Sequence, residues 1–160
     1  MTSTRINHFN NSIGLRLGSR FQFVPEQGVD FEHFLDEGVR LLESEGRRDI
    51  GSMIPELRSK IASLRDDHPL LARRLEFLET VLVVGMEPLL ERADNEIHFA
   101  LLYAIAEVDL VPDVFPEVGY ADDAIICEIV LARHAAFFER FCAVRGMDWS
   151  ALRPDRRRGE

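Results

Sequence analysis

The chain has 160 residues, of which 46% are hydrophobic and 29% are charged, and its formal net charge at pH 7 is −9. This composition is typical of one folded domain rather than a disordered chain. The negative charge argues against nonspecific binding of nucleic acid, and the two cysteines show neither a disulfide framework nor a zinc-binding spacing, which indicates a reduced, cytoplasmic protein.

The two ends of the chain differ from its acidic body. Residues 1–28 contain glycines, asparagines and three arginines without helical periodicity, and we interpret them as an irregular N-terminal arm. Residues 147–160 contain four arginines, and we interpret them as a basic, solvated C-terminal tail. The sequence therefore predicts basic extensions on either side of the folded part.

Apolar residues at helical spacing predict three amphipathic helices, over residues 30–45, 52–64 and 69–84. Pro55 fits the first turn of the second helix, because a proline inside a helix costs about 3 kcal/mol. Pro69 fits the first position of the third helix, where its missing N–H group is tolerated.

Two shorter segments, IHFALLYAIA (97–106) and AIICEIVLA (124–132), are apolar on nearly all sides, and a short turn over residues 87–94 precedes the first. Such helices belong in a protein core or in a membrane, and about ten residues are too few to span a bilayer, which takes about 20. The second segment is expected to continue as one helix to Gly146. The predicted fold is therefore all-α, a compact bundle of about five helices around a buried helical hairpin, forming one domain over residues 29–146.

The link between the two apolar segments, VDLVPDVFPEVGYADDA (108–124), carries five carboxylates and two prolines. Pro112 ends the preceding helix, so Asp109 lies in its last turn, where the helix dipole disfavours a negative charge. Asp122 and Asp123 begin the next helix, where the dipole favours them. Closing the hairpin brings these carboxylates together, and they repel one another unless they are neutralised.

Three interpretations of this acidic link stay open. In the first, its carboxylates cap turns and helices or are solvated. In the second, an arginine of the helical body bridges them, the candidates being Arg73, Arg74 and Arg133. In the third, a divalent cation, Mg²⁺, Mn²⁺ or Ca²⁺, is held by oxygen atoms of Asp109, Asp113, Asp122 and Asp123.

The link also carries a specific residue pattern, Asp-Leu-Val-Pro-Asp (109–113) followed by Pro116, Gly119-Tyr120 and Asp122-Asp123. With its flanking helices, over residues 100–132, this pattern resembles the signature hairpin of the YkvA-like family, a bacterial domain of unknown function. The resemblance implies an all-helical module, sometimes associated with membranes, whose hairpin covers residues 95–145. It implies no established activity. The residues expected to shape the turn are Pro112, Pro116, Gly119 and Tyr120.

Two further features lie outside the link. Glu128 is the one charge within its apolar segment, and an unpaired buried carboxylate is costly. We predict that it is a buried charge that pairs with His98 or with an arginine, or that it opens onto the surface. Phe137, Phe138 and Phe141 are clustered closely enough to predict an exposed patch for a partner.

These features favour a non-enzymatic interaction or scaffold module that is bacterial and cytoplasmic. Its expected partner is a protein or a second copy of the chain, with weak contact to an anionic membrane through the basic ends. No catalytic residue, cofactor or nucleic-acid partner is expected, since motifs such as HExxH and GxSxG do not occur. The alternative is a metal-dependent enzyme that uses the acidic link as a Mg²⁺ or Mn²⁺ site.

Overall fold

The computed structural model describes residues 31–45, 54–84, 91–105 and 121–155. Within these ranges every regular element is a helix, as the sequence predicts. The elements are α2 (Phe31–Glu45), α3 (Ile54–Leu64), α4 (Pro69–Val84), α5 (Glu91–Ile105), α6 (Ala121–Arg133), α7 (Ala135–Arg145) and the short 3₁₀ helix η2 (Trp149–Ala151). The predicted N-terminal arm lies outside the described residues.

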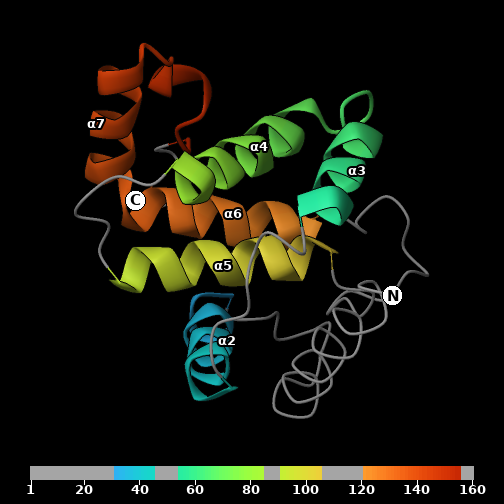
Figure 1. The fold of residues 1–160 in the computed structure, drawn as a ribbon, viewed down its shortest axis with the longest axis vertical. Helices are drawn as coiled ribbons and strands as arrows, with labels where there is room; N and C mark the ends of the chain where they lie inside the picture. The colour runs from blue at the N-terminus through green and yellow to red at the C-terminus, as the bar shows by residue number, and fades with distance from the viewer. Residues whose placement is uncertain (1–30, 46–53, 85–90, 106–120, 156–160) are drawn as a thin grey trace.

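The predicted buried hairpin is confirmed as the pair α5 and α6. These two helices lie side by side at the centre of the molecule, with α4 along one side and α2 on the other (Figure 1). Ile97, Leu101, Ile126 and Val130 are fully buried between the surrounding helices. Burial of each such aliphatic side chain is worth about 1.5–3 kcal/mol, so the apolar composition of both segments places them in the core.

The boundaries of α3 and α4 follow from their prolines. Pro55 is the second residue of α3 and Pro69 is the first of α4, so neither proline interrupts an intrahelical hydrogen bond. The carbonyl of His68 accepts a hydrogen bond from the amide of Ala72 at 3.0 Å, which closes the first turn of α4.

Helix α2 crosses α5 at close range because Gly38 has no side chain. A Cβ atom at this position would overlap the aromatic ring of Phe99. Phe34 also packs edge-on against Phe99 and Tyr103, with ring centroids 5.9 and 5.5 Å apart. The glycine therefore sets how near α2 approaches the hairpin.

Two predicted boundaries are wrong. Helix α5 begins at Glu91, within the segment expected to form a turn over residues 87–94. The last helix is not continuous: α6 ends at Arg133, and His134, with φ −117° and ψ 30°, separates it from α7. Figure 1 shows α7 running across the direction of α6. The side chain of His134 contacts Glu96 of α5, and this contact accompanies the change of direction.

The predicted exposed phenylalanine patch is also wrong. Phe138 and Phe141 are fully buried and Phe137 is half-buried. Phe138 and Phe141 pack edge-on against Phe77 of α4, with ring centroids 5.5 and 5.8 Å apart, and Trp149 joins them at 6.1 Å from Phe138. The cluster fills the space between α4, α7 and the C-terminal segment, so these rings hold the fold together.

The beginning of the predicted basic tail is folded rather than solvated. Gly146 ends α7 with a left-handed conformation at φ 68°, as is common after a helix. Asp148 then caps η2 by accepting a hydrogen bond from the amide of Ser150 at 3.0 Å. Leu152 is buried, and Arg74 donates hydrogen bonds to the carbonyls of Leu152 and Arg153 at 3.0 and 3.1 Å. Residues 147–155 are therefore held against α4 by hydrogen bonds and apolar packing.

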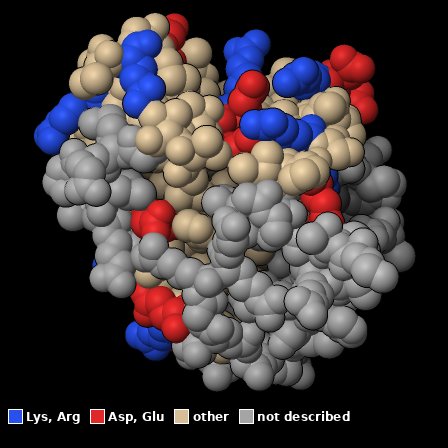
Figure 2. All heavy atoms as spheres, in the orientation of Figure 1, with Lys and Arg blue, Asp and Glu red and all other residues tan. Residues whose placement is uncertain are grey.

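None of the helices in the described ranges is long and apolar enough to cross a membrane. On the face in Figure 2, basic and acidic side chains lie next to one another over the upper part of the molecule, where Figure 1 places α3, α4 and α7. The described part of this face therefore shows no large field of a single charge.

Candidate functional site

A buried carboxylate, Glu96 of α5, lies at the centre of a charged cluster. Its side chain is 1% exposed. One oxygen, Oε1, accepts a hydrogen bond from Nη1 of Arg133 at 2.6 Å, and the other, Oε2, is in short hydrogen-bond contact with Nε2 of His134. Nη1 of Arg133 also donates to Oδ1 of Asp36 at 2.8 Å. Nη2 of Arg92 lies 3.7 Å from the same oxygen. These five residues are called the Glu96 cluster.

The surroundings of Glu96 and Arg133 favour the ionised forms of both side chains. Burial alone would raise the pKa of Glu96, but hydrogen bonds from His134 and Arg133 outweigh burial, and the pKa lies below its ordinary value. For Arg133, burial opposes the charge, but hydrogen bonds to Asp36 and Glu96 keep its pKa above the ordinary value. Both partners are therefore held as ions.

The Glu96 cluster ties together elements that are distant in the sequence. Asp36 belongs to α2, Arg92 and Glu96 to α5, Arg133 ends α6, and His134 precedes α7. Because Glu96 is near the start of α5 and Arg133 is at the end of α6, their contact also shows that these two helices are antiparallel. Removing one partner of a buried ion pair costs several kcal/mol, so the cluster fixes the relative position of the helices.

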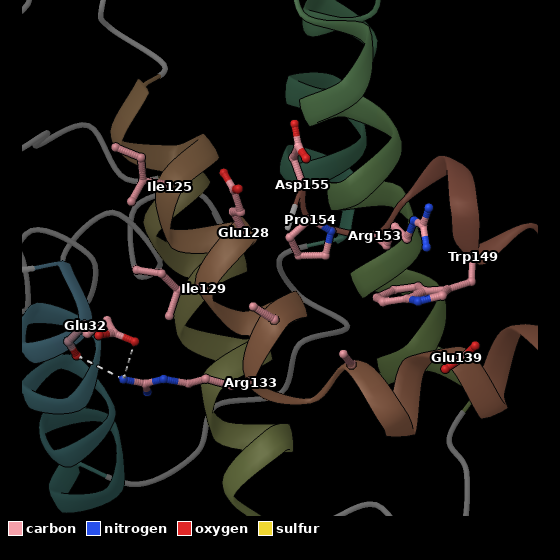
Figure 3. Close-up of a pocket in the computed structure, with 12 residues that line it drawn as sticks. Glu32, Ile125, Glu128, Ile129, Arg133, Glu139, Trp149, Arg153, Pro154 and Asp155 are labelled. Carbon is pink, nitrogen blue, oxygen red and sulfur yellow. Dashed lines mark hydrogen bonds and ion pairs between the residues drawn. The ribbon is translucent and has the colours of Figure 1, made fainter. Parts of the chain in front are cut away.

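An open pocket of about 750 Å³ adjoins the Glu96 cluster, and Arg133 belongs to both. Figure 3 shows Glu32 and Arg133 facing each other at one end, Ile125, Glu128 and Ile129 along α6, and residues of the C-terminal segment on the opposite side. The lining residues are Glu32, Ile125, Glu128, Ile129, Ala132, Arg133, Ala135, Glu139, Trp149, Arg153, Pro154 and Asp155. The volume is within the range of ligand pockets.

The walls of the pocket are both apolar and acidic. Ile125, Ile129, Trp149 and Pro154 provide apolar surface, whereas four carboxylates and two arginines provide charge. The guanidinium of Arg133 is already bonded to Glu96 and Asp36. It also lies near Glu32, with Nη2 of Arg133 and Oε1 of Glu32 4.0 Å apart.

Helix α4 positions the C-terminal wall of the pocket. Arg74 is buried and bonds the carbonyls of Leu152 and Arg153, the two residues that precede Pro154. Trp149 packs against Phe77 and Phe138, with ring centroids 6.4 and 6.1 Å away. These contacts give the wall a defined place, although it belongs to a segment with only one turn of regular structure.

Two of the four predicted metal ligands lie outside the described residues. Asp109 and Asp113 lie outside the described residues, as do Pro112, Pro116, Gly119 and Tyr120. Asp122 and Asp123 lie at the start of α6, as expected, and Asp123 is buried. Among the residues that the structure describes, no group of three His, Cys, Asp or Glu side chains is suited to hold a metal ion.

Of the three arginines proposed to bridge the aspartates, Arg74 and Arg133 form hydrogen bonds with other partners. Arg74 holds the C-terminal segment, and Arg133 belongs to the Glu96 cluster. Arg73 is exposed. Glu128 is half-buried and lines the pocket, whereas His98 contacts the carbonyl of Asp94, four residues earlier on α5.

The two cysteines are buried free thiols. Burial, together with the nearby carboxylate of Asp123, raises the pKa of Cys127 to about 12. Burial also raises the pKa of Cys142. Because the thiolate is the nucleophilic form, neither cysteine is suited to covalent chemistry at neutral pH.

Sequence reasoning did not find Glu96, His134, Asp36 or Trp149 as site residues. One signal was available: Glu96 comes directly before an apolar segment, and Arg133-His134 directly follows another. If the two segments form an antiparallel hairpin, these ends meet, and the acid and the two bases face each other.

Comparison with known proteins gives one match. The model of a family described as "Protein of unknown function (DUF1232)" matches residues 96–129. The matched range runs from Glu96 through α5 and the acidic link into α6. Neither a curated protein nor a solved structure matches the chain. The central hairpin is therefore similar to an uncharacterised domain family.

Proposed function

We propose that this chain is a non-enzymatic helical interaction module and that its partner, a protein or a second copy of the chain, binds at the pocket. The observation that carries the proposal is the pocket itself, with apolar and acidic walls supplied by α2, α6, α7 and the C-terminal segment. Contact surfaces of proteins combine an apolar centre with charged surroundings in this way. We further propose that the hairpin is of the YkvA-like kind and that the protein is bacterial and cytoplasmic, with weak peripheral membrane contact through its basic ends.

The Glu96 cluster supports a structural rather than a catalytic role. A carboxylate and an imidazole in contact are a familiar pair for proton transfer, but a general acid or base must reach its substrate. Glu96 is 1% exposed, and its oxygens are bonded to Arg133 and His134. The pair therefore serves to hold the pocket wall rather than to act on a ligand.

The second candidate is a metal-dependent enzyme that uses the acidic link. The position of Asp123 in the first turn of α6 favours it, because carboxylate oxygens are the ligands that Mg²⁺ and Mn²⁺ prefer. The aspartates that would complete the site are Asp109, Asp113 and Asp122.

Site-specific photo-cross-linking tests the proposed function. Ala132 lines the pocket, whereas Ala143 of α7 does not, and both are exposed. A photo-reactive residue at Ala132 is expected to give a discrete cross-linked species in cells that contain the partner, and the same residue at Ala143 is expected to give none. A doubled mass identifies a second copy of the chain, and any other mass identifies another protein. Equal yields at both positions would contradict the proposal.

A further inference from the structure

The C-terminal segment 147–155, called the strap from here on, forms one wall of the pocket, with Trp149 and Pro154 among its lining residues. We propose that the strap opens and closes as a unit on the folded helices, that Arg74 is its latch, and that the pocket is complete only when the strap is closed. As regulation of partner binding this inference rests on the proposed function, whereas the opening of the strap is a property of the purified chain.

Few side chains hold the strap to the helices. Leu152 is its one buried residue, and Trp149 and Pro154 are half-buried. The other six residues of the strap are exposed. Segments with few buried apolar side chains open at a lower free energy than the core of a protein does. The strap is therefore the part of the described chain that is suited to open while the helices stay folded.

Three main-chain hydrogen bonds lie within the strap itself. The amide of Ala151 donates to the carbonyl of Asp148 at 3.3 Å, and the amides of Leu152 and Arg153 donate to the carbonyl of Trp149 at 3.0 and 2.8 Å. A movement of the strap away from the helices breaks none of these bonds. The strap can therefore move as one body.

Gly146 is suited to be the hinge of this movement. It follows the end of α7 and has a φ of 68°, and a Cβ atom placed on it would have no neighbouring atom within 4 Å. Glycine adopts both signs of φ readily, and hinges are residues at the ends of elements that absorb changes of φ and ψ. A rotation at Gly146 breaks one main-chain hydrogen bond, from the amide of Met147 to the carbonyl of Cys142 at 2.9 Å.

Arg74 of α4 is the polar latch between the helices and the strap. Its side chain is buried, and Nε and Nη2 donate to the carbonyls of Leu152 and Arg153 at 3.0 and 3.1 Å. Among the residues that the structure describes, no carboxylate forms an ion pair with this guanidinium. When the strap opens, the guanidinium and both carbonyls meet water. Opening thus leaves none of these three groups buried without a partner, which would be costly.

Opening of the strap removes one wall of the pocket. Figure 3 shows Trp149, Arg153 and Pro154 on the side of the pocket opposite Ile125 and Ile129 of α6. A partner that contacts both walls binds the closed state and shifts the strap towards closure. Its apparent affinity falls in proportion to the fraction of molecules in which the strap is closed. The latch therefore sets how readily the pocket is available.

Hydrogen exchange of the purified chain, followed by NMR, tests the strap. The amides of Leu152 and Arg153 report on the strap, and those of Leu101 and Val130 report on the buried hairpin. We expect the two strap amides to share one protection factor, at least about tenfold lower than that of the hairpin amides. Low denaturant should leave strap protection unchanged, because the opening exposes little surface.

Substitutions identify the latch. Arg74→Met is expected to lower strap protection by at least about tenfold, because the carbonyls of Leu152 and Arg153 lose a charged donor. Hairpin protection should stay unchanged, since an apolar side chain of similar volume replaces a buried cation without cost to the core. Arg73→Met, at the neighbouring exposed arginine, should change neither. Leu152→Ala lies in the strap itself and should also lower strap protection while the hairpin amides keep theirs.

Three results would overturn the strap as a latched unit. The first is strap protection equal to that of the hairpin, with the same dependence on denaturant. The second is unequal protection of Leu152 and Arg153, which indicates fraying, and the third is an equal effect of Arg74→Met and Arg73→Met. All three are measured without a partner, so the cross-linking yields at Ala132 and Ala143 decide the proposed function separately.

The part of the strap in partner binding has its own readout. Arg74→Met is expected to lower the cross-linking yield at Ala132, because fewer molecules carry the complete pocket. A yield at Ala132 that Arg74→Met leaves unchanged, in a variant whose strap protection has fallen, would overturn the regulation of the pocket by the strap. The interaction surface would then stand without it.

Discussion

Glu96 and Arg133 form a buried ion pair between the start of α5 and the end of α6, with Oε1 and Nη1 2.6 Å apart. The pair closes the hairpin at the end opposite the acidic link, which joins the other two ends of these helices. It also connects the core to the pocket, because Arg133 contributes to the pocket lining. The described part of the hairpin is thus held by charge at one end and by apolar packing along its length.

Replacing Arg133 with an uncharged residue should destabilise the fold strongly. Arg133→Met leaves the carboxylate of Glu96 buried without one of its two hydrogen-bonded partners, and we expect a loss of about 3–5 kcal/mol in the free energy of unfolding. The measurement is denaturant unfolding. Arg140→Met, at an exposed arginine of α7, serves as the control and should change stability by less than about 0.5 kcal/mol. Similar losses in the two variants would mean that the buried pair has no special role.

The same pair predicts a dependence of stability on pH. The pKa of Glu96 is lower in the folded state than in the unfolded state, so the folded protein favours the ionised form. This contribution is complete above the unfolded value of about 4.3 and is lost as the pH falls through the folded value. The difference in unfolding free energy between the natural chain and Glu96→Gln should therefore shrink on acidification below about pH 4.3. A difference that stays constant in this range would contradict the assignment.

Gly38→Ala should destabilise the protein even though alanine is the better helix former by about 0.5–1 kcal/mol. The new methyl group would overlap the ring of Phe99, and overpacking of a core typically costs about 1–3 kcal/mol. Thermal unfolding of a double-mutant cycle with Phe99→Leu provides the check. The cost of Gly38→Ala should fall when the ring is absent. An unchanged cost would show that α2 does not approach α5 at this point.

Both cysteines should be unreactive in the folded protein. Burial holds the pKa of the Cys127 thiol at about 12 and raises that of Cys142, so little thiolate is present at neutral pH. A thiol-specific reagent should label neither residue under native conditions and should label both in denaturant. Rapid native labelling of Cys127 would contradict its position in the core.

The effect of divalent cations on the melting temperature distinguishes an interaction module from a metal-dependent enzyme. If the protein is an interaction module without a metal site, addition of Mg²⁺, Mn²⁺ or Ca²⁺ after chelator treatment should leave its melting temperature unchanged. A site in the acidic link would instead stabilise the fold by about 2.7 kcal/mol when the ion is present at 100 times its Kd. A shift with one ion that disappears in Asp123→Asn would favour the metal-dependent enzyme.

The sequence predicts well those features that local chemistry determines. Pro55 and Pro69 mark the starts of α3 and α4 because a proline is tolerated only in the first turn. The two apolar segments become the central hairpin because no other position would remove them from water on all sides. These features depend on residues that are close together in the chain.

The features that sequence reasoning missed depend on distant contacts. The helix break at His134 is not marked by a proline or a glycine in the sequence. It coincides with a contact to Glu96, 38 residues earlier. The pocket wall depends on Arg74, which bonds the carbonyl of Leu152 across 78 residues. The contact of His134 can be inferred only by pairing the ends of the two apolar segments in an antiparallel hairpin, and the contact of Arg74 leaves no pattern in the sequence near it. The expected continuous helix and solvated tail were therefore both wrong in these places.

The most direct test of the pocket as the interaction surface is the ratio of cross-linking yields from a photo-reactive residue at Ala132 and at Ala143. The two positions are both exposed alanines, and they differ in whether they line the pocket. A discrete species that forms at Ala132 and is lacking at Ala143 is the result that an interaction module with this pocket predicts. A ratio near one, or a species that forms at Ala143 alone, would contradict it.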